Sequence, residues 1–378
     1  MTVPEFDHEK MKLHWYEDLE RALYLAGMIA GCMACGYRLR QWWRDGAMKM
    51  DLAARHLSYK LSLSFADILV LFAFAPAQLI WLTTFWWYGG DFLCRLHKWI
   101  CGFSFTLTGN MQALIAFDRW QSFSRIVHRH QQARSQSVKL RLRLAWLLAF
   151  LTSMPQLYIF QLRDVSSNHT QCTSIILFDS NNIVLDIEHR NRTDFEFTNS
   201  TEYAILQARV NGLKLMERIY NAFHVITMVL IPFTAELIIY VAIMLLLRKV
   251  SQQADEIVRS RSMECSRLSN AGNSAECPHS EARALLPTDV EKPSSRRNSA
   301  RRASKMAEAA LKTEHQRVLD EACAVTRRKV VIMLTINLLF WLPYCTACLL
   351  HVAGGNMQEE MYSASALIVF NSIANIML

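Results

Sequence analysis

The sequence lacks the residue groupings that catalysis and transport require. No nucleophile stands with a candidate general base, and no group of residues has the spacing of metal ligands. His279 lies near Cys277, but we interpret that pair as chance neighbours in a loop rather than a zinc site. The sequence also has no internal repeat of the kind that secondary transporters carry. These absences argue against an enzyme and against a transporter.

Long stretches of the sequence lack charge. The chain has 378 residues, of which 52% are hydrophobic, and the hydrophobic residues are gathered in seven blocks. Any one block could be a buried helix of a soluble protein, but seven blocks approaching the roughly 20 residues that cross a bilayer core favour a membrane protein. The blocks are Ala22–Tyr37, Leu61–Tyr88, Trp99–Phe117, Leu144–Phe160, Ala222–Leu247, Val330–Leu350 and Met361–Leu378.

These blocks predict an all-α membrane protein with a seven-transmembrane helix bundle over residues 19–378. Helix seven is expected to be incomplete at its cytoplasmic end, because the chain stops at Leu378. The predicted helices lie at about 19–40, 56–86, 94–126, 139–161, 218–250, 322–353 and 361–378.

Lysine and arginine are scarce in the second and sixth connections between the blocks, which are short. The net charge of +8 comes mainly from the first, third and fifth loops, and the third loop, Arg119–Arg143, has no acidic residue between its basic ones. The positive-inside rule then places these loops in the cytosol and residues 1–18 outside the cell. Nucleic-acid binding is not needed to explain the positive charge. Residues 1–18 also lack an apolar core, so we expect no cleavable signal peptide.

The fourth connection, roughly 161–218, is predicted to be a long extracellular loop. It contains three glycosylation sequons, at Asn168, Asn191 and Asn199. Cys172 lies in the same loop and Cys94 lies at the outer end of the third helix, where both face an oxidising compartment. We therefore predict a disulfide between them.

The fifth connection is predicted to be disordered over residues 251–305, because it is rich in Ser, Arg, Ala and Glu and poor in aromatics. It contains Arg-Arg-x-Ser twice, ending at Ser299 and Ser304, which predicts phosphorylation by a basophilic kinase. The alternative is a solvated basic run close to anionic lipid.

Polar residues inside the apolar blocks are costly and indicate an interior site. Asp67 has apolar residues on both sides, which favours the bundle interior over an escape into headgroups. Glu236 also lies within a block, where it would face the interior or a cation; the sequence gives no firm role for it. Cys32 and Cys35 form a CxxC, but within a hydrophobic helix we interpret them as packing residues rather than a redox pair.

Together these features resemble the rhodopsin-like (class A) G-protein-coupled receptors. The resemblance depends on the paired cysteines, the Leu-Ser-x-x-x-Ala-Asp sequence ending at Asp67, Asp118-Arg119-Trp120, the Trp-Pro pair of helix four and Trp-x-Pro-Tyr at 341–344. WYGGDFLC at 87–94 and AWLLAFLTSMPQLYIF at 145–160 are similar to the gonadotropin-releasing hormone and adipokinetic hormone receptor branch.

The resemblance implies roles for individual residues. Arg119, flanked by Asp118 and Trp120, would reach the G protein, and Tyr240 would support the active state. Trp341 would be the aromatic switch beneath the ligand, with the helix kinked at Pro343. A sodium-binding polar pocket would be formed by Asp67, Asn371 and Asn375. The peptide ligand would contact Gln78, Trp81, Trp87, Lys98, Cys101 and Tyr344.

Some residues depart from the family pattern. Cys101 replaces a lysine typical of the hormone receptors, Trp120 replaces a tyrosine, and Asn337 stands where a phenylalanine is usual. The Asn-Pro-x-x-Tyr sequence of helix seven is incomplete after Asn375. We expect a multi-pass cell-membrane receptor for a peptide of gonadotropin-releasing or adipokinetic hormone type, coupled to a heterotrimeric G protein. The alternative is a truncated or non-signalling receptor that acts as a decoy or dimer partner.

Overall fold

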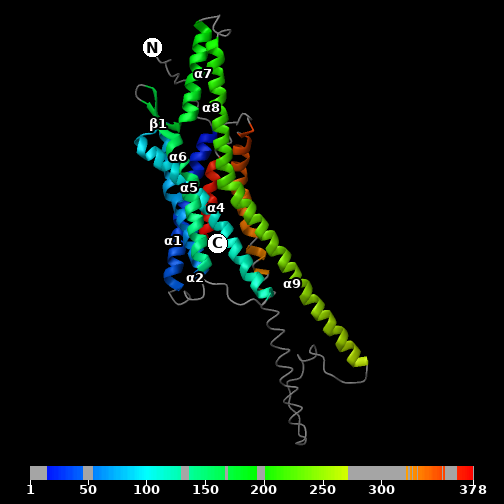
Figure 1. Ribbon diagram of the computed structural model, residues 1–378. Helices are drawn as coiled ribbons and strands as arrows, with labels where there is room; N and C mark the ends of the chain where they lie inside the picture. The colour runs from blue at the N-terminus through cyan, green and yellow to red at the C-terminus, as the bar shows by residue number, and fades with distance from the viewer. Residues whose placement is uncertain are drawn as a thin grey trace, which may run out of the picture. The chain divides into compact units, whose positions relative to one another are not determined.

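The computed structural model describes residues 15–45, 54–128, 136–166, 169–193, 201–270, 321, 324–325, 327–329, 331–350, 352–353 and 364–377 (Figure 1). The chain forms two compact units. The first contains the described residues up to Ser122, from Gln136 to Ile239 and from Leu334 onward; the second contains the remainder.

The first half of the chain supplies four long helical segments. The second segment has a π-helical turn, η3, between its two α-helical parts, and the fourth is broken before a proline. The elements are α1 (Trp15–Asp45), α2 (Ala54–Leu69), η3 (Val70–Phe74), α3 (Ala75–Thr84), α4 (Gly90–His128), α5 (Gln136–Ser153) and α6 (Pro155–Ile159).

The second half adds a two-stranded antiparallel sheet and further helices. An unlabelled helix, Arg327–Leu350, is called the 327–350 helix below. In Figure 1, α1 (blue) and α11 (red) lie side by side, and contacts join them. The labelled elements are β1 (Phe160–Ser166), β2 (His169–Ser174), α7 (Ile175–Thr193), α8 (Thr201–Val225), η5 (Ile226–Leu230), α9 (Ile231–Asn270) and α11 (Ala364–Met377).

Both π turns come directly before a proline. η3 ends two residues before Pro76, and η5 ends two residues before Pro232. A proline removes one backbone donor and crowds the carbonyl of the preceding turn, so a widened turn accommodates it without breaking the helix. At Gly109 of α4, an added Cβ would lie 2.9 Å from Pro232 Cβ, so glycine allows α4 to pass close to this helix.

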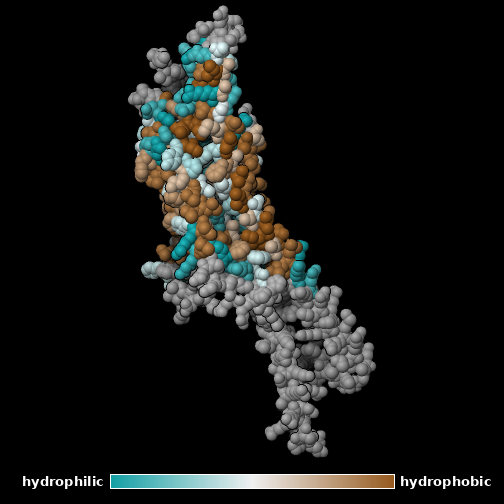
Figure 2. Space-filling view, viewed as in Figure 1, coloured by the Kyte–Doolittle hydropathy of each residue, from teal (hydrophilic) through white to brown (hydrophobic). Residues whose placement is uncertain are grey.

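The hydrophobic surface is typical of a membrane protein. Within the described part of the chain, six helices are long and apolar enough to cross a bilayer, and α11 is a shorter apolar helix of 14 residues. Large hydrophobic side chains stay exposed on the outward faces, such as Ile29 and Met33 of α1 and Leu144, Leu148 and Leu151 of α5. In Figure 2, brown hydrophobic residues cover much of the helices, and teal hydrophilic residues lie toward the α7 end. The fold is the predicted seven-transmembrane bundle.

The long connection predicted at 161–218 differs from expectation. It contains the β1–β2 hairpin, all of α7 and the first residues of α8, which begins at Thr201 rather than near residue 218. α7 and α8 form a helical hairpin whose hydrophobic contact is buried around Ile187 and Val210. The residues packed against that pair are Ile183, Val184, Tyr203 and Leu206.

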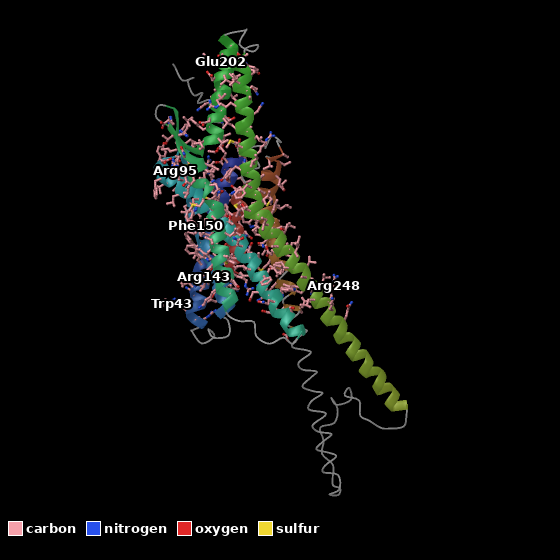
Figure 3. The ribbon with its side chains drawn as sticks, in the orientation of Figure 1. Trp43, Arg95, Arg143, Phe150, Glu202 and Arg248 are labelled. Atoms are coloured by element: carbon pink, nitrogen blue, oxygen red, sulfur yellow. A yellow bond between two sulfur atoms is a disulfide. The ribbon has the colours of Figure 1, made fainter. Side chains whose placement is uncertain are left out.

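Charged residues join the two helices of this hairpin. Arg190 of α7 binds Glu202 of α8 at 2.6 Å and Asp186 at 3.1 Å. Its hydrogen bond to Glu202, with that to Asp186, raises the pKa of the Arg190 guanidinium above its ordinary value. Figure 3 shows Glu202 where the hairpin turns. All three side chains are exposed, so the buried apolar contact contributes more to the hairpin than these ion pairs do.

Several predicted modification sites fall at or beyond the described residues. Asn191 lies exposed in the last turn of α7, whereas Asn168 and Asn199 lie outside the described residues. Ser299 and Ser304 also lie outside them. The loop predicted to be disordered at 251–305 starts within α9, which is helical to Asn270, and residues 271–305 lie outside the described part of the chain.

In the second unit, Tyr240 of α9 is fully buried. Its hydroxyl donates to Met333 Sδ at 3.6 Å, and Ile243 and Leu247 are buried on the same helix. The spacing of these three residues places them on one face of α9. Tyr240 is therefore held by packing, and its role in the active state stays a prediction.

Candidate functional site

The disulfide predicted from the sequence is confirmed. Cys94, in the first turns of α4, is bonded to Cys172 of β2, with their Cα atoms 5.5 Å apart. Both cysteines are buried, and they pack against the indole of Trp87. The bond holds the β1–β2 hairpin on the end of α4.

Hydrogen bonds also fix the position of the β1–β2 hairpin on α4. Asp91 accepts a hydrogen bond from the Leu162 amide of β1 at 2.9 Å, and it pairs with Arg95 at 2.6 Å. Arg95, labelled in Figure 3, also donates to the Leu157 carbonyl at 3.0 Å. These contacts fix the geometry of this corner, which is therefore a structural anchor.

A cavity of about 630 Å³ lies within the first unit. Five residues predicted to contact the ligand line it, namely Gln78 and Trp81 of α3, Lys98 and Cys101 of α4, and Tyr344 of the 327–350 helix. Their contact with a ligand stays a prediction. Sequence reasoning did not identify several other lining residues, which include Glu17, Glu20, Gln156, Gln171, Tyr220, His224 and Ser365.

Trp87 differs from its predicted role in ligand contact. It is not among the residues that line the cavity, and its indole N–H donates to the Gly90 carbonyl at 3.0 Å. Its ring packs on the Cys94–Cys172 bond and meets the Trp81 ring edge-on, with centroids 5.6 Å apart. Trp87 therefore supports the cavity wall from behind.

Lys98 places a cation in an aromatic wall. Its Nζ lies 4.5 Å from the Trp81 ring centroid and 5.1 Å from that of Phe160, distances at which cation–π attraction operates. Among the described residues no carboxylate lies within 4 Å of this ammonium group. Trp81 in turn donates to Gln171 Oε1 of β2 at 2.8 Å, so the hairpin orients the wall.

α1 and α11 bring an acid to the same cavity. Glu20 is 6% exposed and accepts a hydrogen bond from the Ser365 hydroxyl at 3.3 Å. Ser365 also hydrogen-bonds the Tyr24 hydroxyl at 2.9 Å. Glu20 was missed because it stands near the polar N-terminal stretch, where an acid carries no signal of its own.

Further polar groups line the cavity. The Gln156 amide lies 3.4 Å from His224 Nδ1, joining α6 to α8. Gln78 Oε1 is buried without a hydrogen-bond partner among the described residues. Cys101, in place of a family lysine, has its sulfur 3.8 Å from His97 Nε2. The cavity therefore offers a cation, an acid and an unused acceptor to a ligand.

Trp341 lies next to residues of the cavity wall. Its ring meets the Phe105 ring edge-on at 5.8 Å and that of Tyr344 at 6.2 Å, and both of these neighbours line the cavity. Trp341 itself is 7% exposed, and Pro343 follows it on the same helix. Trp341 therefore packs behind the cavity wall, and its role as a switch stays a prediction.

The polar residues predicted to share a pocket are brought together only in part. Asn375 Nδ2 donates to Asp67 Oδ1 at 3.2 Å. Asp67 Oδ2 and both side-chain polar atoms of Asn371 are buried and have no hydrogen-bond partner among the described residues. Three polar atoms with unused bonding capacity therefore lie in the bundle interior.

Asp118, Arg119 and Trp120 lie near the far end of α4. Asp118 is buried, with its carbonyl accepting from the Ser122 hydroxyl at 2.8 Å, and Arg119 is half-buried. Trp120 packs on Phe117, with ring centroids 5.6 Å apart.

Part of the chain matches a known receptor family. Residues 49–188 match the model of the 7 transmembrane receptor (rhodopsin family). The chain is 34% identical over 134 residues to the G-protein coupled receptor daf-38 of Caenorhabditis elegans, covering 35% of this chain and 31% of that protein.

Two further relatives carry the names of peptide hormone receptors. The chain is 29% identical over 134 residues to the gonadotropin-releasing hormone receptor of Sus scrofa, covering 35% of this chain and 40% of that one. It is 35% identical over 151 residues to the human vasopressin V1b receptor, covering 39% and 35%. The matched segments thus span about a third of the length of these relatives.

Proposed function

We propose that this chain, which carries a rhodopsin-family seven-transmembrane receptor segment at residues 49–188, is a receptor for a peptide hormone. It would lie in the cell membrane with its N-terminus outside and pass the signal to a heterotrimeric G protein. Relatives named as gonadotropin-releasing hormone and vasopressin receptors support a ligand of that chemical class. The matched family is one of receptors rather than of enzymes.

The observation that carries this proposal is the polar content of the cavity. Lys98 offers a cation without a carboxylate partner among the described residues, and Gln78 offers a free acceptor oxygen. A backbone or terminal amide of a peptide provides both a carbonyl for Lys98 and an N–H for Gln78. The aromatic rings of Trp81 and Phe160 supply apolar contact beside them.

The signal would follow from unequal affinity for two arrangements of the helices. A peptide that presses on Tyr344 and Phe105 favours the arrangement in which Trp341 has moved. The 327–350 helix would then swing about Pro343 and uncover Arg119 for a G protein. Asp118 and Trp120 would hold the arginine in place, and Tyr240 would support the active arrangement.

We expect Lys98→Ala to weaken the peptide response roughly 10- to 100-fold, because a charge-assisted hydrogen bond is lost. The probes are amidated peptides of the gonadotropin-releasing hormone, adipokinetic hormone and vasopressin types. The measurement is calcium or inositol phosphate release from cells that display the chain. Lys98→Arg should lose less, because it keeps the cation.

Lys214 provides the matched control, since it is an exposed lysine of α8 that does not line the cavity. Lys214→Ala should respond like the unaltered chain. A surface-displayed chain that binds none of these peptides would overturn the proposal. Binding without calcium release would instead support the decoy alternative.

We propose that the interior around Asp67 holds a sodium ion, as the family resemblance implies. Asp67 Oδ2 and Asn371 Oδ1 are hard oxygen donors, both buried and both without a partner among the described residues. A bound ion would supply the positive charge that a buried carboxylate otherwise lacks. The protein groups that would hold it are Asp67 and Asn371, with Asn375 fixing the second carboxylate oxygen.

We expect the purified chain to melt at a higher temperature in sodium chloride than in choline chloride of equal ionic strength, because a bound ion stabilises the folded state. Asp67→Asn should abolish that difference. Asp91→Asn is the control, since Asp91 is exposed and pairs with Arg95. Equal melting of the unaltered chain in the two salts would exclude the sodium site.

A further inference from the structure

A continuous chain of hydrogen bonds joins two buried carboxylates across five helices. Asn375 of α11 donates to Asp67 of α2 at 3.2 Å, and Gln112 of α4 donates to Asn375 Oδ1 at 3.0 Å. Gln112 also donates to Asn337 Oδ1 at 3.1 Å. Asn337, on the 327–350 helix, donates to both carboxylate oxygens of Glu236 of α9, at 3.0 and 3.2 Å.

The two carboxylates at the ends of this hydrogen-bond network fix which group donates in each bond. A carboxylate accepts hydrogen bonds, so Asn375 and Asn337 must turn their N–H groups toward Asp67 and Glu236. Their carbonyl oxygens then face inward, where only a donor can satisfy both. Gln112 supplies one N–H to each, from a single Nε2 atom. A leucine at Gln112 would leave both oxygens without this donor.

Most residues of this hydrogen-bond network are shielded from water. Asp67 is 0% exposed, Glu236 and Asn337 are each 2%, and Gln112 is 3%. Amide groups buried this deeply cannot exchange a lost partner for water, so breaking one bond leaves its partner unsatisfied. A buried hydrogen-bond network of this kind therefore stabilises one arrangement of its helices relative to other arrangements.

Asn337 is the member of the chain nearest to the cavity wall along a helix. It precedes Trp341 by one helical turn, and Trp341 contacts Phe105 and Tyr344 of the wall. A movement of Trp341 with its helix would carry Asn337 with it. Asn337 bonds at once to α4 and to α9, so both bonds must change when this helix moves.

We propose that Gln112, Asn337 and Glu236 form a polar lock that holds the 327–350 helix against α4 and α9, with the Asp67–Asn375 pair extending it to α2 and α11. Glu236 acts as the acceptor at one end. Moving the 327–350 helix requires Asn337 to release both Gln112 and Glu236. Its use in hormone signalling rests on the proposed function, whereas the lock itself does not.

The test is hydrogen–deuterium exchange of the full chain in lipid nanodiscs, without peptide or G protein. Gln112→Leu and Asn337→Leu should each make backbone amides at 334–349 exchange roughly 5- to 150-fold faster, the range expected when a buried polar bond is broken. The fold increase in exchange rate for the double variant should be smaller than the product of the two single-variant fold increases, because the two residues share a bond. Amides of α5 should be unchanged.

Matched variants separate a lock from general loss of stability. Thr108 lies one turn before Gln112 on α4 and is equally buried, but its hydroxyl has no hydrogen-bond partner among the described residues. Thr108→Val should therefore exchange like the unaltered chain. Glu236→Gln keeps an oxygen that accepts from Asn337 and should have little effect, whereas Glu236→Leu should resemble Asn337→Leu.

Three results would overturn the lock: single effects that multiply fully, faster exchange in α5 as well as at 334–349, or a Thr108→Val effect equal to that of Gln112→Leu. None of these measurements involves a ligand. If no peptide ever binds the chain, the proposed receptor function fails while the exchange results stand.

Discussion

Cys172→Ser should lower the stability of the purified, membrane-reconstituted chain by about 2–4 kcal/mol, because it removes a bond between residues 78 positions apart. The same change frees the β1–β2 hairpin from α4 and with it Gln171, which orients Trp81. Peptide binding should therefore fall together with stability. The measurements are thermal melting and binding of the peptide panel described above.

Several comparisons make this result specific to the bond. Cys94→Ser and the double variant should match Cys172→Ser, since each removes the same disulfide. Reducing the unaltered chain should produce the same melting curve. Cys32→Ser is the control, because Cys32 is an exposed free cysteine of α1. A Cys172→Ser chain that melts like the unaltered one would contradict the prediction.

Val210→Asp should open the α7–α8 hairpin, because it places an unpaired charge at a position that is 1% exposed and packed against Ile187. Burying an isolated carboxylate costs several kcal/mol of free energy. This cost is larger than the stabilisation that one hydrophobic contact provides. Backbone amides of residues 175–193 and 201–215 should then exchange rapidly with solvent. The rest of the bundle should keep its protection, since the hairpin has its own hydrophobic contact.

Ile205→Asp provides the matched control on the same helix. Ile205 is 67% exposed, so an aspartate there remains in contact with solvent. Its hairpin should exchange like that of the unaltered chain. Rapid exchange in both variants would show that the hairpin depends on the hydrophobicity of α8 in general rather than on the Ile187–Val210 contact.

The bundle could be predicted from the sequence because hydrophobic length is a local property. Charge-free runs such as Trp99–Phe117 are long enough to cross a bilayer whatever their neighbours are. The Cys94–Cys172 bond was also predictable, because both cysteines fell in segments assigned to one compartment. The lining residues Gln78 and Lys98 followed from family resemblance.

The α7–α8 hairpin could not be predicted in the same way. α7 mixes charged and polar residues with its apolar ones, so it has no long charge-free run. Ile183, Val184 and Ile187 recur at helical spacing, as do Tyr203, Leu206 and Val210, and the two sets pack against each other. The sequence therefore contains the helical spacing of both apolar sets, but this spacing indicates a hairpin only once the two helices are known to be partners.

Glu236 shows a second limit of sequence reasoning. Its place in a hydrophobic block indicated an interior position, yet its partner, Asn337, lies 101 residues away on another helix. Asn337 was noticed as a departure from the family pattern, and nothing in the sequence linked the two. Trp87 was misplaced for a related reason, since an aromatic near a cavity can face it or support it from behind.

The π turn at Val70–Phe74 has a consequence for the angular phase of everything that follows it on the helix. A regular α-helix advances each residue by about 100°, and a π turn holds one extra residue without advancing the helix by a full step. Gln78 and Trp81 therefore point where residues one position away would point on an uninterrupted helix. Aligning this segment with a relative that lacks the turn would pair the wrong side chains, although the two sequences could still match letter for letter before it.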